Sequence, residues 1–251
     1  MTQHDAFLFH ALALFWADAF LSLFSLVSLM HNQLATLPDS IAALTALKQL
    51  HLSFNKFTTL PKPIVKLTSL TTLFLGGNKL VTLPDSIAVL TALKELDLRR
   101  NQLVTLPDSI VELTALEVLN LKYNQLVTLP DAIASLTVLK KLELGRNKFA
   151  TFPKPIVKLT SLTTLHLFGN QLVRLPDSIA ALTALEYLQL DDNQIVTLPN
   201  SIAALMALEV LALYNNPLAK PQSSAVEVWL AALEAGSCDD MVVDPEGDCE
   251  W

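Results

Sequence analysis

The amino-acid sequence predicts an α/β solenoid: a right-handed coil with a concave parallel β-sheet of about nine strands and short helical or 3-10 returns on its convex side. The first observation is a 23-residue period that runs from residue 24 into the low two-hundreds. The second is an asparagine at position 9 of every copy. The third is a constant set of apolar positions, among them 1, 4, 6, 11, 14, 18 and 21. The copies begin at Phe24, Leu47, Leu70, Leu93, Leu116, Leu139, Leu162, Leu185 and Leu208.

A single copy shows why the chain coils. In the copy from residue 93 to 115, LKELDLRRNQLVTLPDSIVELTA, apolar and polar residues alternate from position 4 to 7, which predicts a short strand with one inward face. Pro107 ends the strand region, and Asp108 and Ser109 can start a short helical turn. Ile110 and Leu113, three residues apart, then face inward. No copy can bury these side chains alone, so the copies stack around a shared core.

The asparagines predict a ladder along the stack. Each lies where the chain leaves the strand, and its side chain can bond the backbone groups of neighbouring copies that would otherwise be buried without partners. The series is Asn32, Asn55, Asn78, Asn101, Asn124, Asn147, Asn170, Asn193 and Asn216.

This pattern, LxxLxLxxNxLxxLPxxIxxLxx, resembles that of the leucine-rich repeat family over about residues 24–220. We place the repeat domain at residues 24–221, with eight full copies and a partial ninth that stops after Pro217. The LPxxI segment is similar to that of intracellular Ras-interacting leucine-rich repeat proteins. That resemblance implies a signalling scaffold or regulator, with a small GTPase or another signalling protein as a candidate partner.

Residues 1–23 are apolar on nearly every face, and three interpretations remain open. They can form an N-terminal cap over the apolar end of the stack, as solenoid ends require. They can form a secretory signal, with an apolar core at 7–16 and small residues at Ala17 and Ala19, although no Lys or Arg precedes Phe7. Residues 6–24 are also long enough for a membrane span, but Asp18 and the lack of flanking positive charge weaken that reading.

Residues 222–236 predict a C-terminal capping helix. Ser224 and Glu227 have the spacing of a capping box, and Gly236 is a helix stop. Between them an amphipathic face is formed by Val226, Trp229, Leu230 and Leu233. The acidic tail, 237–251, is expected to fray. A disulfide between Cys238 and Cys249 is the alternative in a secreted protein, and the tail fits no calcium-loop spacing.

Charge and cysteine content limit the partners and the compartment. The net charge is −7, and residues 237–251 hold six acids without Lys or Arg, so the remainder carries about −1. This balance gives no case for nucleic-acid binding. Both cysteines lie in the tail, so the core needs no disulfide, as in a reducing compartment. We therefore expect a cytoplasmic protein, with a secreted protein or one anchored through residues 6–24 as the alternative.

Function is predicted on the concave face, where positions 3, 5, 7 and 8 of each copy do not repeat. Arg99, Arg100, Lys122 and Arg146 suggest a basic strip, and Asp191 and Asp192 an acidic end. Aromatic and arginine anchors on such a surface suit a protein or peptide partner. The candidate contact residues are Phe54, Phe74, Arg99, Arg100, Lys122, Tyr123, Arg146, His166, Phe168, Tyr187, Asp191, Asp192 and Tyr214.

The sequence predicts neither catalysis nor a cofactor or metal site. No phosphate-binding glycine loop, H-E-x-x-H, C-x-x-C or G-x-S-x-G motif occurs. His166 and Glu143 fall side by side in adjacent copies, which we interpret as a surface pair of little energetic weight. We expect a monomeric, non-catalytic protein-interaction module. The alternatives are a secreted or membrane-tethered recognition receptor or effector, and a regulatory subunit of an enzyme.

Overall fold

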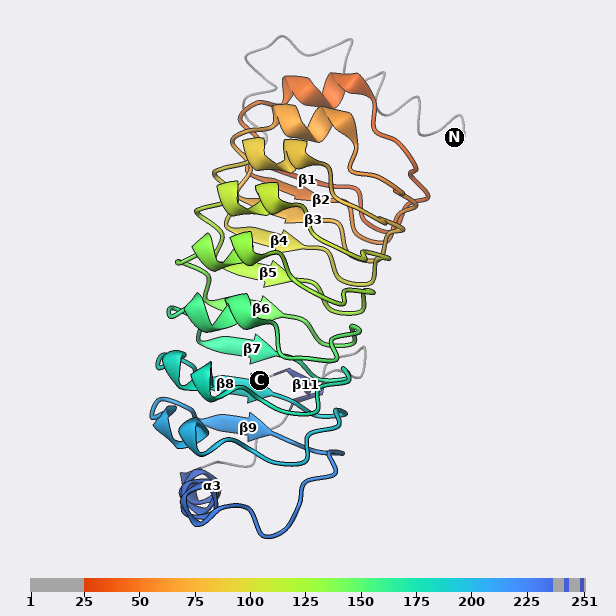
Figure 1. Cartoon of the computed structure of the whole chain (residues 1–251). Coiled ribbons are helices and arrows are strands. Elements are labelled where there is room, and N and C mark those ends of the chain that lie inside the picture. Colours follow the sequence, from red (N-terminus) through yellow and green to blue (C-terminus); the bar gives the residue numbers. More distant parts are fainter. Residues whose placement is uncertain (1–24, 237–241, 244–248, 251) are drawn as a thin grey trace.

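The computed structural model describes residues 25–236, 242–243 and 249–250. One parallel sheet runs the length of the molecule, with nine strands in chain order, as predicted (Figure 1). Each residue of β1 to β8 pairs with the residue 23 positions later, such as Leu96 with Leu119. The strands are β1 (Leu26–Ser28), β2 (Gln49–His51), β3 (Thr72–Phe74), β4 (Glu95–Asp97), β5 (Val118–Asn120), β6 (Lys141–Glu143), β7 (Thr164–His166), β8 (Tyr187–Gln189) and β9 (Val210–Ala212).

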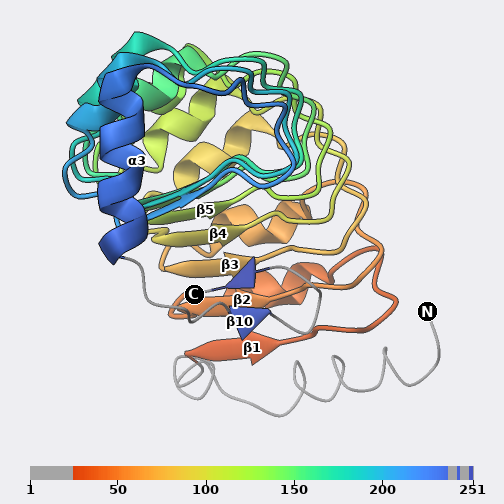
Figure 2. The ribbon, with the colours of Figure 1, turned by 90° about the horizontal axis from the view of Figure 1, so that it is seen from below.

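Short 3-10 helices return the chain on the side opposite the sheet (Figure 2). A proline in extended conformation precedes each helix, and the leucine after it donates its N–H to the isoleucine carbonyl, as Leu113 does to Ile110. These returns match the predicted short helical or 3-10 segments. They are η1 (Asp39–Ala43), η2 (Lys62–Lys66), η3 (Asp85–Val89), η4 (Asp108–Glu112), η5 (Asp131–Ser135), η6 (Lys154–Lys158), η7 (Asp177–Ala181) and η8 (Asn200–Ala204).

The core is one continuous apolar column inside these coils, where a coil denotes one copy of the repeat, numbered 1 to 9. In coil 5, Leu119, Leu121, Leu126 and Ile133 are all 0% exposed. Full burial of such a side chain contributes roughly 1.5–3 kcal/mol. The constant positions of the sequence are therefore constant because the column requires them.

The asparagine ladder joins each coil to the one before it. Asn124 Nδ2 donates to the carbonyls of Leu121 in its own coil and Leu98 in the preceding coil, both at 3.0 Å. Its Oδ1 accepts the N–H of Leu103 at 3.0 Å. The same three bonds recur from Asn55 to Asn216, which confirms the predicted ladder.

A helix of 13 residues, α3 (Ser224–Gly236), lies at the far end of the stack beyond β9 (Figure 1). Val226 is 0% exposed, and Trp229, Leu230 and Leu233 pack against the core. The cap differs from the expected Ser224 box: the Val226 N–H donates to Ser223 Oγ at 3.4 Å, and Glu227 Oε1 accepts the Gln222 N–H at 2.7 Å. Ser223 is thus the N-cap, one residue earlier than the spacing suggested.

The two remaining described segments, β10 (Val242–Val243) and β11 (Cys249–Glu250), pair antiparallel. The expectations for residues 1–23, and for a bond involving Cys238, fall outside the described residues. Within the part of the chain that the structure describes, no helix is long and apolar enough to cross a membrane.

Candidate interaction surface on the concave face

The strands and the residues that follow them place positions 3, 5, 7 and 8 on the concave side. Burial alternates along β4: Leu96 is 0% exposed, whereas Glu95 and Asp97 on either side are half-buried. Of the candidate residues, Phe74, His166 and Tyr187 lie in strands. Those in the segments after strands are Phe54, Arg99, Arg100, Lys122, Tyr123, Arg146, Phe168, Asp191, Asp192 and Tyr214.

Position 8 has a left-handed backbone in every coil. The φ angle is +56° at Tyr123 and +53° at Arg100. Glycine holds this position in coils 3 and 7, at Gly77 and Gly169. These two glycines, together with Asp192 and Asn215, were the signal in the sequence that position 8 has a positive φ, because Gly, Asn and Asp tolerate it best. At Phe54 and Arg146 the side chain lies against the glycine at position 8 of the next coil, Gly77 and Gly169 respectively.

An ion cluster that is buried except for Lys141 occupies the centre of the face. Lys122 Nζ lies 2.9 Å from Glu143 Oε2, and Lys141 Nζ lies 2.6 Å from Glu143 Oε1. Burial alone would raise the pKa of Glu143, but the positive charges of Lys122, Lys141 and His166 outweigh it and lower that pKa. We call Lys122, Lys141, Glu143 and His166 the central ion cluster.

This cluster corrects two expectations. Lys122 is only 3% exposed, so it is a buried partner of Glu143 and not part of an exposed basic strip. His166 and Glu143 are adjacent, as expected, but they are 6% and 3% exposed and therefore do not form a surface pair. For Lys122 the physical reason is that Phe168, itself 7% exposed, lies against it, with Lys122 Nζ 5.9 Å from the ring centroid.

A glycine makes room for Phe168. A Cβ on Gly145 would lie 2.2 Å from Cε1 of the Phe168 ring, so only glycine allows this ring position. The Phe168 ring also meets Tyr123 edge-on at 6.4 Å, and the Arg100 guanidinium lies 4.7 Å from the Tyr123 ring centroid. The structure thus brings together four candidate residues of coils 4, 5 and 7 in one packed group: Arg100, Lys122, Tyr123 and Phe168.

The other two candidate arginines, Arg99 and Arg146, lie next to carboxylates. Arg99 Nε lies 3.2 Å from Asp97 Oδ2, and the Arg99 N–H donates to Asp97 Oδ1 at 2.9 Å. Burial raises the pKa of Asp97 to about 6, although both contacts with Arg99 act in the opposite direction. Arg146 Nη2 lies 3.6 Å from Asp192 Oδ2, which joins the proposed basic strip to the proposed acidic end.

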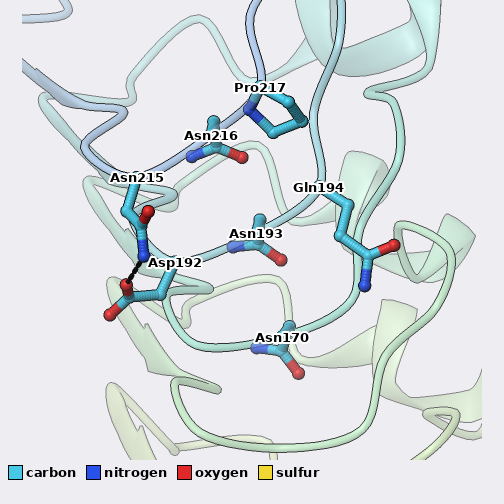
Figure 3. A pocket seen from close by; sticks show the side chains of 7 residues that line it. All are labelled: Asn170, Asp192, Asn193, Gln194, Asn215, Asn216 and Pro217. Atoms are coloured by element: carbon cyan, nitrogen blue, oxygen red, sulfur yellow. Dashed lines mark hydrogen bonds between the residues drawn. The ribbon is translucent and has the colours of Figure 1, made fainter.

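Asp191 and Asp192 tie the last coils together. Asp191 Oδ1 accepts the Tyr214 N–H at 2.7 Å, and Asp192 Oδ1 accepts Asn215 Nδ2 at 2.7 Å. Burial raises the pKa of Asp191. Beside them lies an open hollow of about 470 Å³, with a polar wall built from ladder asparagines and their neighbours (Figure 3). Its lining residues are Asn170, Asp192, Asn193, Gln194, Asn215, Asn216 and Pro217.

Two histidines belong to the surface although we did not select them from the sequence. His31 stacks on Phe54 at 4.4 Å between ring centroids, and His51 stacks on Phe74 at 4.5 Å. Reading positions 5 and 8 as columns would have placed these rings on neighbouring strands. Among the described residues, no group of three or more His, Cys, Asp or Glu side chains is placed to hold a metal ion.

The repeat geometry agrees with comparisons to known families. The leucine rich repeat model matches residues 24–80, 68–126 and 91–149, and a leucine-rich repeat region model matches residues 132–234. The chain therefore belongs to the leucine-rich repeat family. A comparison with curated proteins gave no match.

Similar solved structures include a bacterial internalin and plant receptors. Internalin C2 from Listeria monocytogenes is 32% identical with a TM-score of 0.72, over 79% of this chain and 84% of that one. The plant peptide hormone receptor RGFR1, in complex with RGF2, is 29% identical with a TM-score of 0.66, over 78% of this chain. The Arabidopsis receptor kinase HAESA, in complex with the peptide hormone IDA and the co-receptor SERK1, is 29% identical with a TM-score of 0.66, over 80% of this chain. The chain spans only 34% and 36% of these two receptor chains.

Proposed function

We propose that this protein is a non-catalytic recognition module that binds a protein or peptide across its concave face. The observation that carries the proposal is the contrast between the two faces of each coil. Inward positions keep the same leucines, whereas positions 3, 5, 7 and 8 hold aromatic, charged and small side chains that differ from coil to coil. Core packing does not require this diversity, but discrimination of a partner does.

The packing on this face also favours binding. Phe168, Lys122 and Glu143 are held in place before any partner arrives, which reduces the entropy that binding must remove. RGFR1 and HAESA, both similar in fold, were each solved with a peptide or hormone bound, which supports a peptide or protein partner here.

Cytoplasmic signalling with a small GTPase remains a prediction based on the LPxxI resemblance. A secreted or membrane-tethered receptor or effector is the second candidate. The likeness to plant receptors and to an internalin favours it.

The test is affinity capture with two matched triple variants. Arg146→Ser, Tyr187→Thr and Tyr214→Ser alter exposed or half-buried concave residues, whereas Lys66→Ser, Glu112→Ser and Lys158→Ser alter exposed convex ones. Proteins bound by the wild type should be lost with the concave variant and kept with the convex variant, as measured by quantitative mass spectrometry. Partners that remain bound to a folded concave variant contradict the proposal.

A further inference from the structure

The concave face is divided by charge. Coils 1 to 3 carry no Asp, Glu, Lys or Arg at their twelve outward positions, whereas coils 4 to 6 carry eight charged residues at the same positions. The uncharged set is Leu26, Ser28, Met30, His31, Gln49, His51, Ser53, Phe54, Thr72, Phe74, Gly76 and Gly77. We call this set the aromatic zone, because two stacked ring pairs dominate it.

The strand spacing produces these stacks. Neighbouring parallel strands lie about 4.8 Å apart, which is close to the separation of two stacked rings. Rings at the same repeat position in successive coils therefore meet face to face, at 9° between planes for His31 and Phe54 and 21° for His51 and Phe74. Both phenylalanines stay half-buried, so each ring has a part that faces solvent.

Gly77 fixes the position of one ring. A Cβ at Gly77 would lie 2.6 Å from Cδ1 of Phe54, so the absence of a side chain is what lets the ring lie over coil 3. Gly77 also has a φ of +65°. The phenylalanine is thus held by His31 on one side and by bare backbone on the other.

In the neighbouring zone six of the eight charged residues take part in the following ion pairs: Arg99 with Asp97, Lys122 and Lys141 with Glu143, and Arg146 with Asp192 of coil 8. A charged ligand would have to compete with these pairs. The residues of the aromatic zone carry no such charges, so a ligand bound there would not have to displace an ion pair. A charged group of the ligand would find no counter-charge there, however, and would lose its hydration without compensation.

We infer that the aromatic zone is a subsite for an uncharged stretch of the partner peptide that carries an aromatic side chain. Three strands span about 10 Å, which is room for about three residues of an extended peptide. This inference deepens the concave-face function proposed above and depends on it.

The probe is a library of random 12-residue peptides displayed on phage and selected on the full chain. We expect the selected peptides to contain short uncharged stretches with Phe, Tyr or Trp. Their affinities are then measured by fluorescence polarisation against the wild type and the double variant Phe54→Asn, Phe74→Asn. Asparagine occupies the same repeat positions at Asn215 and Asn120, so the fold accepts it there.

The double variant should weaken binding of these peptides by about tenfold or more, as the loss of aromatic anchors does. Gly77→Asn displaces the Phe54 ring without removing it, and it should also weaken binding of these peptides. Lys66→Ser, which alters an exposed residue on the convex side of coil 2, serves as the control and should change affinity less than about twofold. Circular dichroism and urea unfolding show that each variant is folded.

The outcomes separate the two proposals. Peptides that bind the concave face with unchanged affinity for the folded double variant overturn the aromatic subsite and leave the recognition function standing. Selection that yields only peptides insensitive both to the concave triple variant and to the double variant overturns both proposals.

Discussion

The Asp97 carboxyl couples stability to pH. Its pKa of about 6 in the folded protein lies above the ordinary value of 3.8, so the folded state holds the proton more tightly than the unfolded chain. The stabilisation that this proton provides is fully present below pH 3.8 and is lost as the pH rises to about 6.

Asp97→Asn should therefore stabilise the protein above pH 6, by on the order of 2 kcal/mol, and make no difference below pH 4. Asparagine is a matched replacement, because Asn120 holds the same repeat position in the next coil. Asn120 accepts the Lys122 N–H at 3.1 Å, just as Asp97 accepts the Arg99 N–H. Urea unfolding between pH 3.5 and 8 measures the difference. A constant difference across this range would show that Asp97 does not titrate as described.

Lys122→Met should destabilise the protein by about 3 kcal/mol, because it leaves Glu143 buried with one cation fewer. The double variant Lys122→Met, Glu143→Met removes both charges and should recover part of that loss. The free energy of unfolding of the two single variants and the double variant gives the coupling energy. A single variant as stable as the wild type would mean that Lys122 is solvated and not an ion-pair partner.

At the scale of structural elements, the asparagine ladder offers an internal control. Asn124 bonds two coils, whereas Asn32 is exposed and, within the described part of the chain, its side-chain amide donates only to Leu29 and Met30 of its own coil. Asn124→Ala should cost roughly 1–3 kcal/mol through unsatisfied buried partners, and Asn32→Ala about 0.5 kcal/mol or less. Equal losses in thermal or urea unfolding would contradict the role of the ladder in joining coils.

The period of the sequence was enough to place strands and returns because core packing repeats in every coil. It predicted that Leu96 and Leu98 point inward and that η4 begins at Asp108. It could not predict that Lys122 and Glu143 are buried. Their burial depends on how the outward side chains of neighbouring coils cover one another. This cover depends in turn on Gly145, which leaves space for the Phe168 ring. Such neighbour effects are not periodic.

At the scale of the whole molecule, stability should be nearly a sum over coils and their contacts. Deletion of coil 4, residues 93–115, removes one full period and lets β5 pair with β3 in the original register. We expect a folded protein with a cooperative transition and a lower free energy of unfolding. Deletion of residues 93–112 is the control, since it breaks the period and should prevent native stacking. Circular dichroism and urea unfolding distinguish the two.

The left-handed turn at position 8 has a consequence for how this surface can change. A residue other than glycine in this conformation costs roughly 1–2 kcal/mol, yet His31, Phe54, Arg100, Tyr123, Arg146, Asp192 and Asn215 all adopt it. Gly77 and Gly169 show that the fold accepts the relaxed choice. The diversity of the concave face is therefore maintained against a conformational preference for glycine. A change of one of these residues to glycine would relieve the backbone cost and, by the same step, remove a side chain from the surface.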